Sequence, residues 1–358
     1  MGRTSRTALL ALIVSAALAQ HASGQSLTFS LLERYLDSLR QQSGIPGLSA
    51  AVVQNGRVVW EKGFGLSDIE HSIAARPDTP YHVADLTEAL SSTLLLEQCV
   101  ETGHLGLDDR LQQWMPSFSE SGTTVRDVLA HRSQSGAFKY DAGRYATLTG
   151  VIEACIQKNP TPFRQAMANR LFERLGMSDS VPAQNVDDSS DDDRAIFSDS
   201  QLQRFSGVLQ RMALPYRVSG GNASVNTSVS KSLNATTGAI STVRDLARYD
   251  GALDDSILLH RDTMAAMWSN SPAASGAAMP TGLGWFVQDY NGQRVYWQFG
   301  STPGAYSSLL VKLPGKPGKN LTLILLANSD GLSAPFALQD GDVTASLFAR
   351  AFLRLFVG

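Results

Sequence analysis

The chain has 358 residues, of which 43% are hydrophobic and 18% charged, so it is long and apolar enough to form one or two packed domains. This composition excludes a disordered or fibrous protein. The net charge of −3 gives no overall basic field, so we expect no nucleic-acid partner. The two cysteines, Cys99 and Cys155, are too few for a disulfide-built scaffold; they form either one bridge or two buried thiols.

The first 19 residues have the pattern of a secretory signal peptide. Arg3 and Arg6 precede an apolar run over residues 8–18, and small residues before Gln20 mark a cleavage site. The run is shorter than the roughly 20 residues that span a membrane, and no later run reaches that length. We expect a secreted or periplasmic protein without a membrane span. A mitochondrial transit peptide is the alternative, because hydroxyl residues accompany the arginines and acids are absent.

Apolar periodicity predicts the main elements in chain order. A leading helix is expected over residues 31–40, followed by two strands that turn at Asn55-Gly56, a dipeptide typical of tight hairpins. The strands are expected at 48–53 and 57–60, helical segments at 94–101, 125–130, 150–157 and 163–175, further strands at 284–287, 307–311 and 321–327, and a closing helix at 343–356.

Strands at both chain ends therefore bracket a helical middle. The expected fold class is α/β (α+β), with an antiparallel sheet built from both ends, flanked by the terminal helices and interrupted by an all-helical insertion. We assign residues 1–19 to the signal peptide, 26–84 plus 251–358 to the sheet domain, and 85–250 to the helical domain.

Short motifs occur in a fixed order along the chain. They are Gly47 to Gly56, Gly63 to Gly65, Gly103 to Asp109, Thr124 to His131, Leu175 to Met177, Ser241 to Ala247, Gly282 to Trp285, Gly300 to Gly304 and Ala327-Asn328. Together they resemble the serine β-lactamase-like and penicillin-binding-protein-like hydrolases. The resemblance covers about residues 45 to 330 and implies that family's fold, in which three further motifs line one cleft.

The first cleft motif of that family is Ser-x-x-Lys at the start of a buried helix, where the lysine amine activates the serine hydroxyl. The family's pattern F-x-I-A-S-x-T-K aligns with residues 81–88, which puts Asp85 at the serine and Glu88 at the lysine. A register one residue later puts Leu86 and Ala89 at these positions. Neither register restores the pair.

The other two motifs are also altered. Tyr-x-Asn aligns with Tyr140-Asp141-Ala142, and Lys-Thr-Gly or His-x-Gly, on the edge strand, aligns with Gln298-Phe299-Gly300. The family's oxyanion hole would correspond to the backbone N–H groups of Asp85 and Ser301. The resemblance thus implies these cleft positions, with no catalytic residue assigned: Asp85, Glu88, Tyr140, Ala142, Gln298, Gly300 and Ser301.

Two carboxylates in place of serine and lysine invert the expected charge of the cleft. We therefore predict an exported, non-catalytic relative that binds a peptide, a cell-wall fragment or a small molecule there, with basic or neutral ligands favoured over carboxylates. The alternative is an active esterase or peptidase with a rewired nucleophile: Asp85, Tyr140 or an unaligned serine. A cation held between the two acids is a third alternative.

The remaining chemistry-bearing residues have plainer interpretations. Ser228 and Lys231 spell Ser-x-x-Lys but lie in a Ser/Asn-rich stretch, so we interpret them as a chance match. His131 is expected to be structural, and His82 is a candidate to contact the cleft. The run 187–193 lacks the glycine and glutamate of a calcium loop and is expected to be a solvated acidic loop. We expect no metal site and no cofactor.

Overall fold

The computed structural model of the chain describes residues 27–155, 160–315 and 320–358. The expected signal peptide lies outside these residues. None of the helices in the described part of the chain is long and apolar enough to cross a bilayer.

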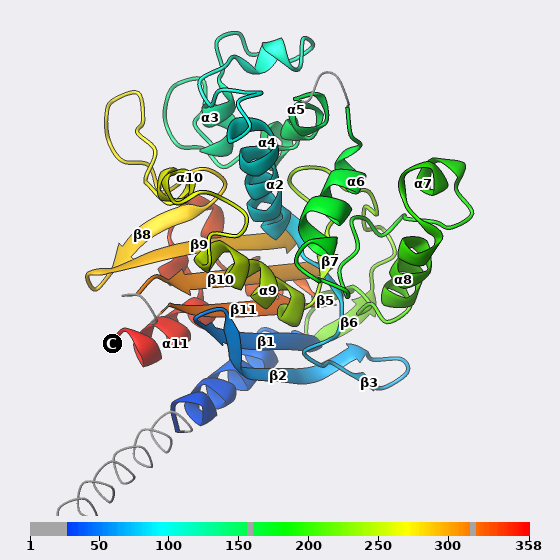
Figure 1. Ribbon diagram of the computed structural model, residues 1–358. Helices are drawn as coiled ribbons and strands as arrows, with labels where there is room; N and C mark the ends of the chain where they lie inside the picture. The colour runs from blue at the N-terminus through cyan, green and yellow to red at the C-terminus, as the bar shows by residue number, and fades with distance from the viewer. Residues whose placement is uncertain (1–26, 156–159, 316–319) are drawn as a thin grey trace, which may run out of the picture.

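A seven-stranded antiparallel sheet joins the two ends of the chain (Figure 1). Its order is β3-β2-β1-β11-β10-β9-β8, and β1 pairs with β11 through Leu48 opposite Ala327. The strands are β1 (Gly47–Gln54), β2 (Arg57–Asp68), β3 (Ile73–Ala74), β8 (Phe286–Tyr290), β9 (Gln293–Thr302), β10 (Tyr306–Leu313) and β11 (Leu321–Ala327). The expected fold class is confirmed, and the structure adds β3 and β9 to the strands expected from periodicity.

Helices cover both faces of the sheet. Because side chains alternate along each central strand, every such strand contributes residues to both layers of packing. In β1, Leu48 and Ala50 pack with the helix over residues 27–42 and with α11 (Leu347–Phe356). Ala51 and Val53 instead join the larger core beneath α2 (Thr87–Leu95) and α9 (Val243–Asp254). The sheet is therefore the middle layer of three, and α9 lies across its helical side (Figure 1).

The middle of the chain is largely helical. Its helices are α3 (Val125–Leu129), α4 (Ala142–Tyr145), α5 (Leu148–Ala154), α6 (Phe163–Ala166), α7 (Asp191–Ile196), α8 (Asp199–Leu209) and α10 (Arg261–Met267), with two small sheets, β4 (Tyr81–His82) with β7 (Ile240–Ser241) and β5 (Tyr216–Ser219) with β6 (Asn222–Val225). Within the helix expected at 94–101, α2 continues into a π-helical segment, η2 (Leu96–Val100). Within the helix expected at 163–175, α6 continues into a second π-helical segment, η4 (Met167–Glu173). Residue 250, where we divided the two domains, lies inside α9.

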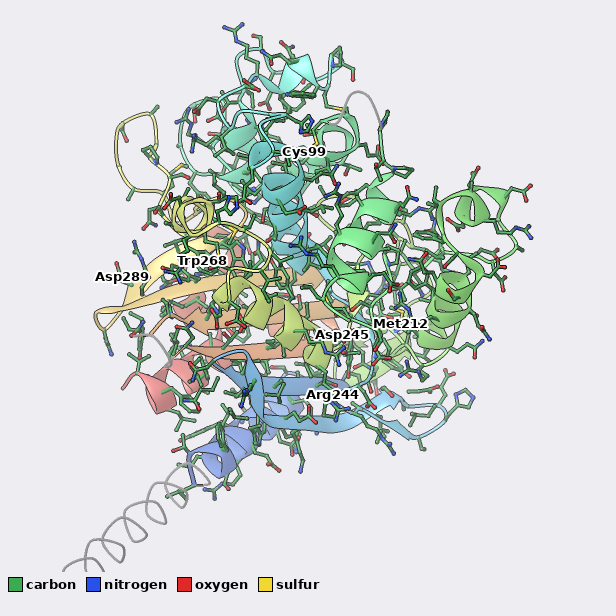
Figure 2. The ribbon with its side chains drawn as sticks, viewed as in Figure 1. Cys99, Met212, Arg244, Asp245, Trp268 and Asp289 are labelled. Atoms are coloured by element: carbon green, nitrogen blue, oxygen red, sulfur yellow. A yellow bond between two sulfur atoms is a disulfide. The ribbon has the colours of Figure 1, made fainter. Side chains whose placement is uncertain are left out.

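The two cysteines form a disulfide that joins the end of η2 to the end of α5. Cys99 and Cys155 have Cα atoms 5.7 Å apart and are 56 residues apart in sequence. Figure 2 shows Cys99 at the end of this long helical segment that points away from the sheet. The bridge decides between the two alternatives left open by the sequence.

The acidic run over residues 187–193 is not wholly a solvated loop, which corrects our expectation. Ser190 caps α7, accepting a hydrogen bond from the backbone N–H of Asp193. The Asp193 side chain is buried and pairs with Arg164 at 2.6 Å. Asp193 is therefore a structural residue, because an isolated buried carboxylate would be costly.

Candidate functional site

Asp85 lies in a sharp turn that leads from β4 into α2. The turn is a 3-10 helix, η1 (Ala84–Leu86), and β4 is tied to the segment before β7 by the bond from Val83 N–H to Ala239 O, at 2.9 Å. Ala84 has a φ of +52°, a left-handed conformation that a residue with a side chain adopts at an energetic cost. The surrounding packing therefore holds this corner in place and presents Asp85 at the helix start.

The orientation of α2 separates the two sequence registers. Leu86 and Ala89 are buried in the apolar core of the helical side. Asp85 and Glu88 instead reach residues of the other aligned motifs. The Asp85/Glu88 register is thus the one that brings the aligned positions together.

The Asp85 carboxylate contacts the third motif. Its Oδ2 accepts a hydrogen bond from the backbone N–H of Ser301, at 2.8 Å. Burial raises the pKa of Asp85 to about 7, and the nearby Glu88 charge acts in the same direction, while the Ser301 and Asp85 N–H groups oppose the shift. The side chain at the aligned nucleophile position therefore accepts from the Ser301 amide, one of the two amides that the family resemblance assigns to the oxyanion hole.

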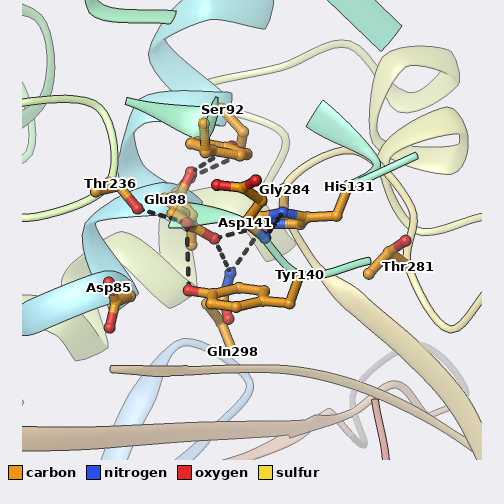
Figure 3. Close-up of polar contacts among 12 residues, drawn as sticks. Asp85, Glu88, Ser92, His131, Tyr140, Asp141, Thr236, Thr281, Gly284 and Gln298 are labelled. Carbon is orange, nitrogen blue, oxygen red and sulfur yellow. Dashed lines mark hydrogen bonds and ion pairs between the residues drawn. The ribbon is translucent and has the colours of Figure 1, made fainter. Parts of the chain in front are cut away.

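Glu88 is fully buried, and four side chains donate to its carboxylate (Figure 3). Oε1 accepts from the Thr236 hydroxyl at 2.5 Å and from the Tyr140 hydroxyl at 3.3 Å. Oε2 accepts from Gln298 Nε2 at 3.3 Å and contacts His131 Nε2 at 3.2 Å. Donors from four separate segments thus converge on a carboxylate at the position where the family resemblance places lysine.

The hydrogen bonds of His131 define its tautomer. The backbone N–H of Asp141 lies 3.2 Å from Nδ1, which must accept because an amide N–H can only donate. The proton therefore resides on Nε2 and is donated to Glu88. We expected a structural histidine from the sequence; the structure places its ring against the cleft carboxylate, 4.5 Å from the Tyr140 ring centroid.

Tyr140 contacts Glu88 with its hydroxyl and β9 with its ring. Burial, and then the charges of Glu88 and Asp85, raise the pKa of Tyr140 well above 10, so its phenol stays protonated and donates to Glu88. The Tyr140 ring packs 5.4 Å from that of Phe299 on β9. Ala142 opens α4, and its methyl group takes no part in the polar network. The second motif thus retains a hydrogen-bond donor and lacks a second polar group.

Gln298 and Gly300 lie on the half of β9 that borders the cleft. The pairing of β8 with β9 ends at Trp297, so β9 is an inner strand of the sheet over its first half, and beyond that residue the described chain places no strand beside it on that side. Gln298 is buried and also donates to Gly284 O at 3.2 Å. Gly300 is closely packed, since a Cβ there would lie 2.4 Å from Val83 O.

The other candidate residues lie away from this network. His82 is buried, its Nδ1 accepts from Ala84 N–H at 3.0 Å, and burial lowers its pKa to about 4. Ser228 and Lys231 are exposed in an irregular segment. In the described ranges, no group of three or more His, Cys, Asp or Glu side chains is arranged to hold a metal ion. Sequence reasoning missed Thr236, because the loop that carries it has no periodic signal.

A family model with the description Beta-lactamase matches residues 32–345. The chain belongs to the beta-lactamase family. The recognised landmarks and the three-layer arrangement are explained by this membership.

Several curated proteins align with part of the chain. The chain is 27% identical over 159 residues to a "Putative penicillin-binding protein PbpX" of Bacillus subtilis, covering 36% of this chain and 40% of that protein. It is 29% identical over 146 residues to a "Teichoic acid D-alanine hydrolase" of Staphylococcus aureus, covering 39% of this chain and 34% of that protein. The chain thus spans less than half the length of each of these relatives.

Solved structures of similar fold extend over most of the chain. A penicillin-binding protein homologue from Pyrococcus abyssi superposes with a TM-score of 0.67 at 18% identity, covering 90% of this chain and 76% of that chain. A D-amino acid amidase from Ochrobactrum anthropi, solved with L-phenylalanine amide, superposes with a TM-score of 0.65 at 19% identity, covering 91% of this chain and 99% of that one. At this level of identity the likeness establishes the fold alone.

Proposed function

We propose that this chain is an exported, non-catalytic member of the beta-lactamase family that binds a peptide-like or other small ligand in the cleft. The observation that carries the proposal is the buried Glu88, whose two carboxylate oxygens are occupied by four side-chain donors. Acyl transfer to serine needs a hydroxyl nucleophile and a base that takes its proton. Position 85 has no hydroxyl, and the carboxylate at position 88 has no unoccupied oxygen facing it.

Electrostatics supports the same conclusion. Asp85 and Glu88 are acidic groups one helical turn apart, and the cation expected in the third motif is the neutral Gln298. A tetrahedral intermediate develops negative charge on an oxygen, which these carboxylates would destabilise. The D-amino acid amidase of similar fold was solved with L-phenylalanine amide and with L-phenylalanine, and the proposed ligand is of that general size.

A second candidate function is hydrolysis with Asp85 as nucleophile. The strained corner at Ala84 favours it, since such conformations concentrate at active sites. This candidate predicts that Asp85→Ala or Tyr140→Phe abolishes hydrolysis of an activated ester while the melting temperature stays near that of the parent. Unchanged rates in both variants would exclude it.

Intact-mass spectrometry tests the proposal directly. The mature protein is incubated with a β-lactam or with p-nitrophenyl acetate, beside an Asp85→Ser/Glu88→Lys variant. An Asp188→Ser/Glu70→Lys variant makes the same exchanges at two exposed acids and controls for nonspecific acylation. We expect no stoichiometric adduct on the parent or on the surface variant. An adduct on the parent would overturn the proposal, and peptide mapping would name its nucleophile.

Export is a separate part of the proposal. The Cys99–Cys155 disulfide supports it, because such bonds persist in oxidising compartments and are rare in the cytosol. N-terminal sequencing of the protein recovered from the periplasm or culture medium should begin at Gln20. Recovery of chains beginning at Met1 from the cytosol alone would contradict export.

A further inference from the structure

Asp85 is the one solvent-accessible residue at the start of α2. Every other residue of the segment 81–96 is buried, whereas Asp85 is partly exposed. Tyr140 and Thr302, which belong to the segments of the second and third motifs, are partly exposed as well. A ligand that enters the cleft can therefore reach the Asp85 carboxylate but no other side chain of this segment.

The Asp85 carboxylate has no basic partner, although a buried acid elsewhere in the chain has one. Asp193 pairs with Arg164 at 2.6 Å. Asp85 Oδ2 accepts from the Ser301 N–H, and within the described ranges no Lys, Arg or His side chain forms an ion pair with either Asp85 oxygen. Figure 3 shows Asp85 apart from the donors that converge on Glu88. The carboxylate thus has an unmet electrostatic interaction on the open side of the cleft.

Two further oxygen atoms border this side of the cleft. The Tyr140 hydroxyl donates its proton to Glu88 Oε1, which leaves the lone pairs of the phenol oxygen free to accept from a ligand. Thr302 follows Gly300 by two positions on β9, so its side chain lies on the same face, and that face contacts η1 at Gly300. The groups beside Asp85 can therefore accept hydrogen bonds, as a ligand with several N–H donors requires.

We propose that the Asp85 carboxylate is the recognition point for a primary ammonium group on a small ligand, with Tyr140 and Thr302 lining the site. An ammonium group supplies three N–H donors and the positive charge that the carboxylate lacks. A ligand carboxylate would instead meet a like charge. The inference rests on the proposed function, because it names the ligand class of the same non-catalytic cleft.

Binding of a cation should compete with protonation of Asp85. Burial raises the pKa of Asp85 to about 7, so the acid is largely neutral at pH 5.5 and largely ionised at pH 8. A bound ammonium group favours the ionised form. Ligand binding should therefore release a proton near neutral pH and become tighter as the pH rises.

Other titratable groups near η1 should not produce this pH dependence. Those on the elements and segments around it are Glu88 on α2, Arg294 and Tyr296 on β9, Tyr306 and Lys312 on β10, Tyr81 and His82 on β4, and Tyr140. Glu88 is the charged side chain that shifts the pKa of Asp85. Burial lowers the pKa of His82 to about 4 and raises the pKa values of these four tyrosines, so all five are neutral between pH 5.5 and 8.

Benzylammonium is the probe, and benzyl alcohol, which is neutral and of nearly the same shape, is the control ligand. Isothermal titration calorimetry measures their binding to the parent, to Asp85→Asn and to Asp255→Asn, which removes an exposed acid directly after α9. We expect saturable benzylammonium binding by the parent and Asp255→Asn at pH 8, at least tenfold weaker at pH 5.5. Asp85→Asn should bind at least tenfold more weakly at pH 8 and show no such pH dependence.

Three results would overturn the inference. The first is equal binding of benzylammonium by the parent and by Asp85→Asn, each shown to be folded by circular dichroism. The second is benzyl alcohol binding as tight as that of benzylammonium. The third is a parent that binds no benzylammonium, or binds it equally at pH 5.5 and 8; this series needs no variant and decides the matter if Asp85→Asn does not fold.

The proposed function fails by a different measurement. Hydrolysis of p-nitrophenyl acetate by the parent, lost in Asp85→Ala, would overturn the non-catalytic assignment whatever the result with benzylammonium. Conversely, a parent without turnover that ignores benzylammonium leaves the non-catalytic assignment standing and rejects the ammonium site.

Discussion

The Nε2–H of His131 donates to Glu88 Oε2 over 3.2 Å, although the two residues are 43 positions apart in sequence. This contact joins the segment after α3 to the buried start of α2. With the bonds from Thr236, Tyr140 and Gln298, it makes Glu88 the centre of a network that holds four segments together at the cleft. A carboxylate at this position therefore stabilises the fold of the cleft.

Two substitutions of Glu88 should differ in their cost. In Glu88→Gln, the new amide group can face the hydroxyls of Tyr140 and Thr236, which can rotate to accept, while the remaining oxygen still accepts from His131 and Gln298. We expect a loss of about 1 kcal/mol in unfolding free energy. Glu88→Met has similar volume but leaves the buried donors without an acceptor and should cost about 3–5 kcal/mol. Urea denaturation measures both, and equal losses would contradict the network.

The pH dependence of stability should change when Asp85 is replaced by asparagine. Its folded pKa of about 7 exceeds the ordinary 3.8, so the folded state binds this proton more tightly than the unfolded state. The resulting stabilisation is complete below about pH 4 and is lost as the pH rises through about 7. Relative to Asp85→Asn, the parent should therefore lose on the order of 1–3 kcal/mol between about pH 4 and 8.

Urea denaturation at several values across that pH range checks this prediction. Asp245 has a pKa of about 6, also raised by burial, but it is present in both proteins and cancels in the comparison. Asp255→Asn, at an exposed position directly after α9, controls for the loss of a surface carboxylate. If the free energy of unfolding of the parent and of Asp85→Asn followed parallel curves against pH, the raised pKa of Asp85 would be contradicted.

Local signals account for the elements that the sequence predicted well. Asn55 and Gly56 adopt φ values of +51° and +72°, the left-handed geometry that their dipeptide favours, so the first hairpin was predictable. The strand β9 was not found from periodicity, because its buried and half-buried side chains do not follow a simple alternation. The π-helical turns depend on packing and have no sequence signature of comparable strength.

The residues of the candidate site were also only partly predictable from the sequence. The positions of Asp85, Glu88 and Gln298 followed from the order of the family motifs, and the structure places Gln298 in hydrogen-bond contact with Glu88, one helical turn from Asp85. Thr236 was not predictable, because its bond to Glu88 joins residues 148 positions apart and its loop has no periodic pattern. Contacts of this length are set by the tertiary fold and not by local propensity.

The Cys99–Cys155 disulfide should contribute substantially to stability. It closes a loop of 56 residues, for which the chain-entropy relation gives about 4 kcal/mol at 25 °C. The double variant Cys99→Ala/Cys155→Ala should therefore melt several degrees below the oxidised parent and match the parent in reducing agent. A melting temperature of the parent that does not respond to complete reduction would contradict this expectation.

Lys312 on β10 is buried between two carboxylates of α9. Its Nζ lies 2.9 Å from Asp250 Oδ1 and 2.6 Å from Asp254 Oδ1, and 5.9 Å from the ring centroid of Trp268, which is labelled in Figure 2. Burial raises the pKa of Asp250, and the Asp254 charge adds to this effect against the opposing influence of Lys312. Two anions thus share one cation at the end of α9, where the helix dipole is also negative.

Single substitutions in this triad should therefore have unequal effects on stability. Lys312→Met preserves length and volume but leaves two uncompensated buried carboxylates, so we expect a loss of about 3–5 kcal/mol in the free energy of unfolding. Asp254→Asn removes the excess negative charge and keeps the pair between Lys312 and Asp250, so stability should stay within about 1 kcal/mol of the parent or rise. Urea denaturation at pH 7.5 compares the two variants. An equal loss of stability in both would contradict the interpretation that two carboxylates share one cation.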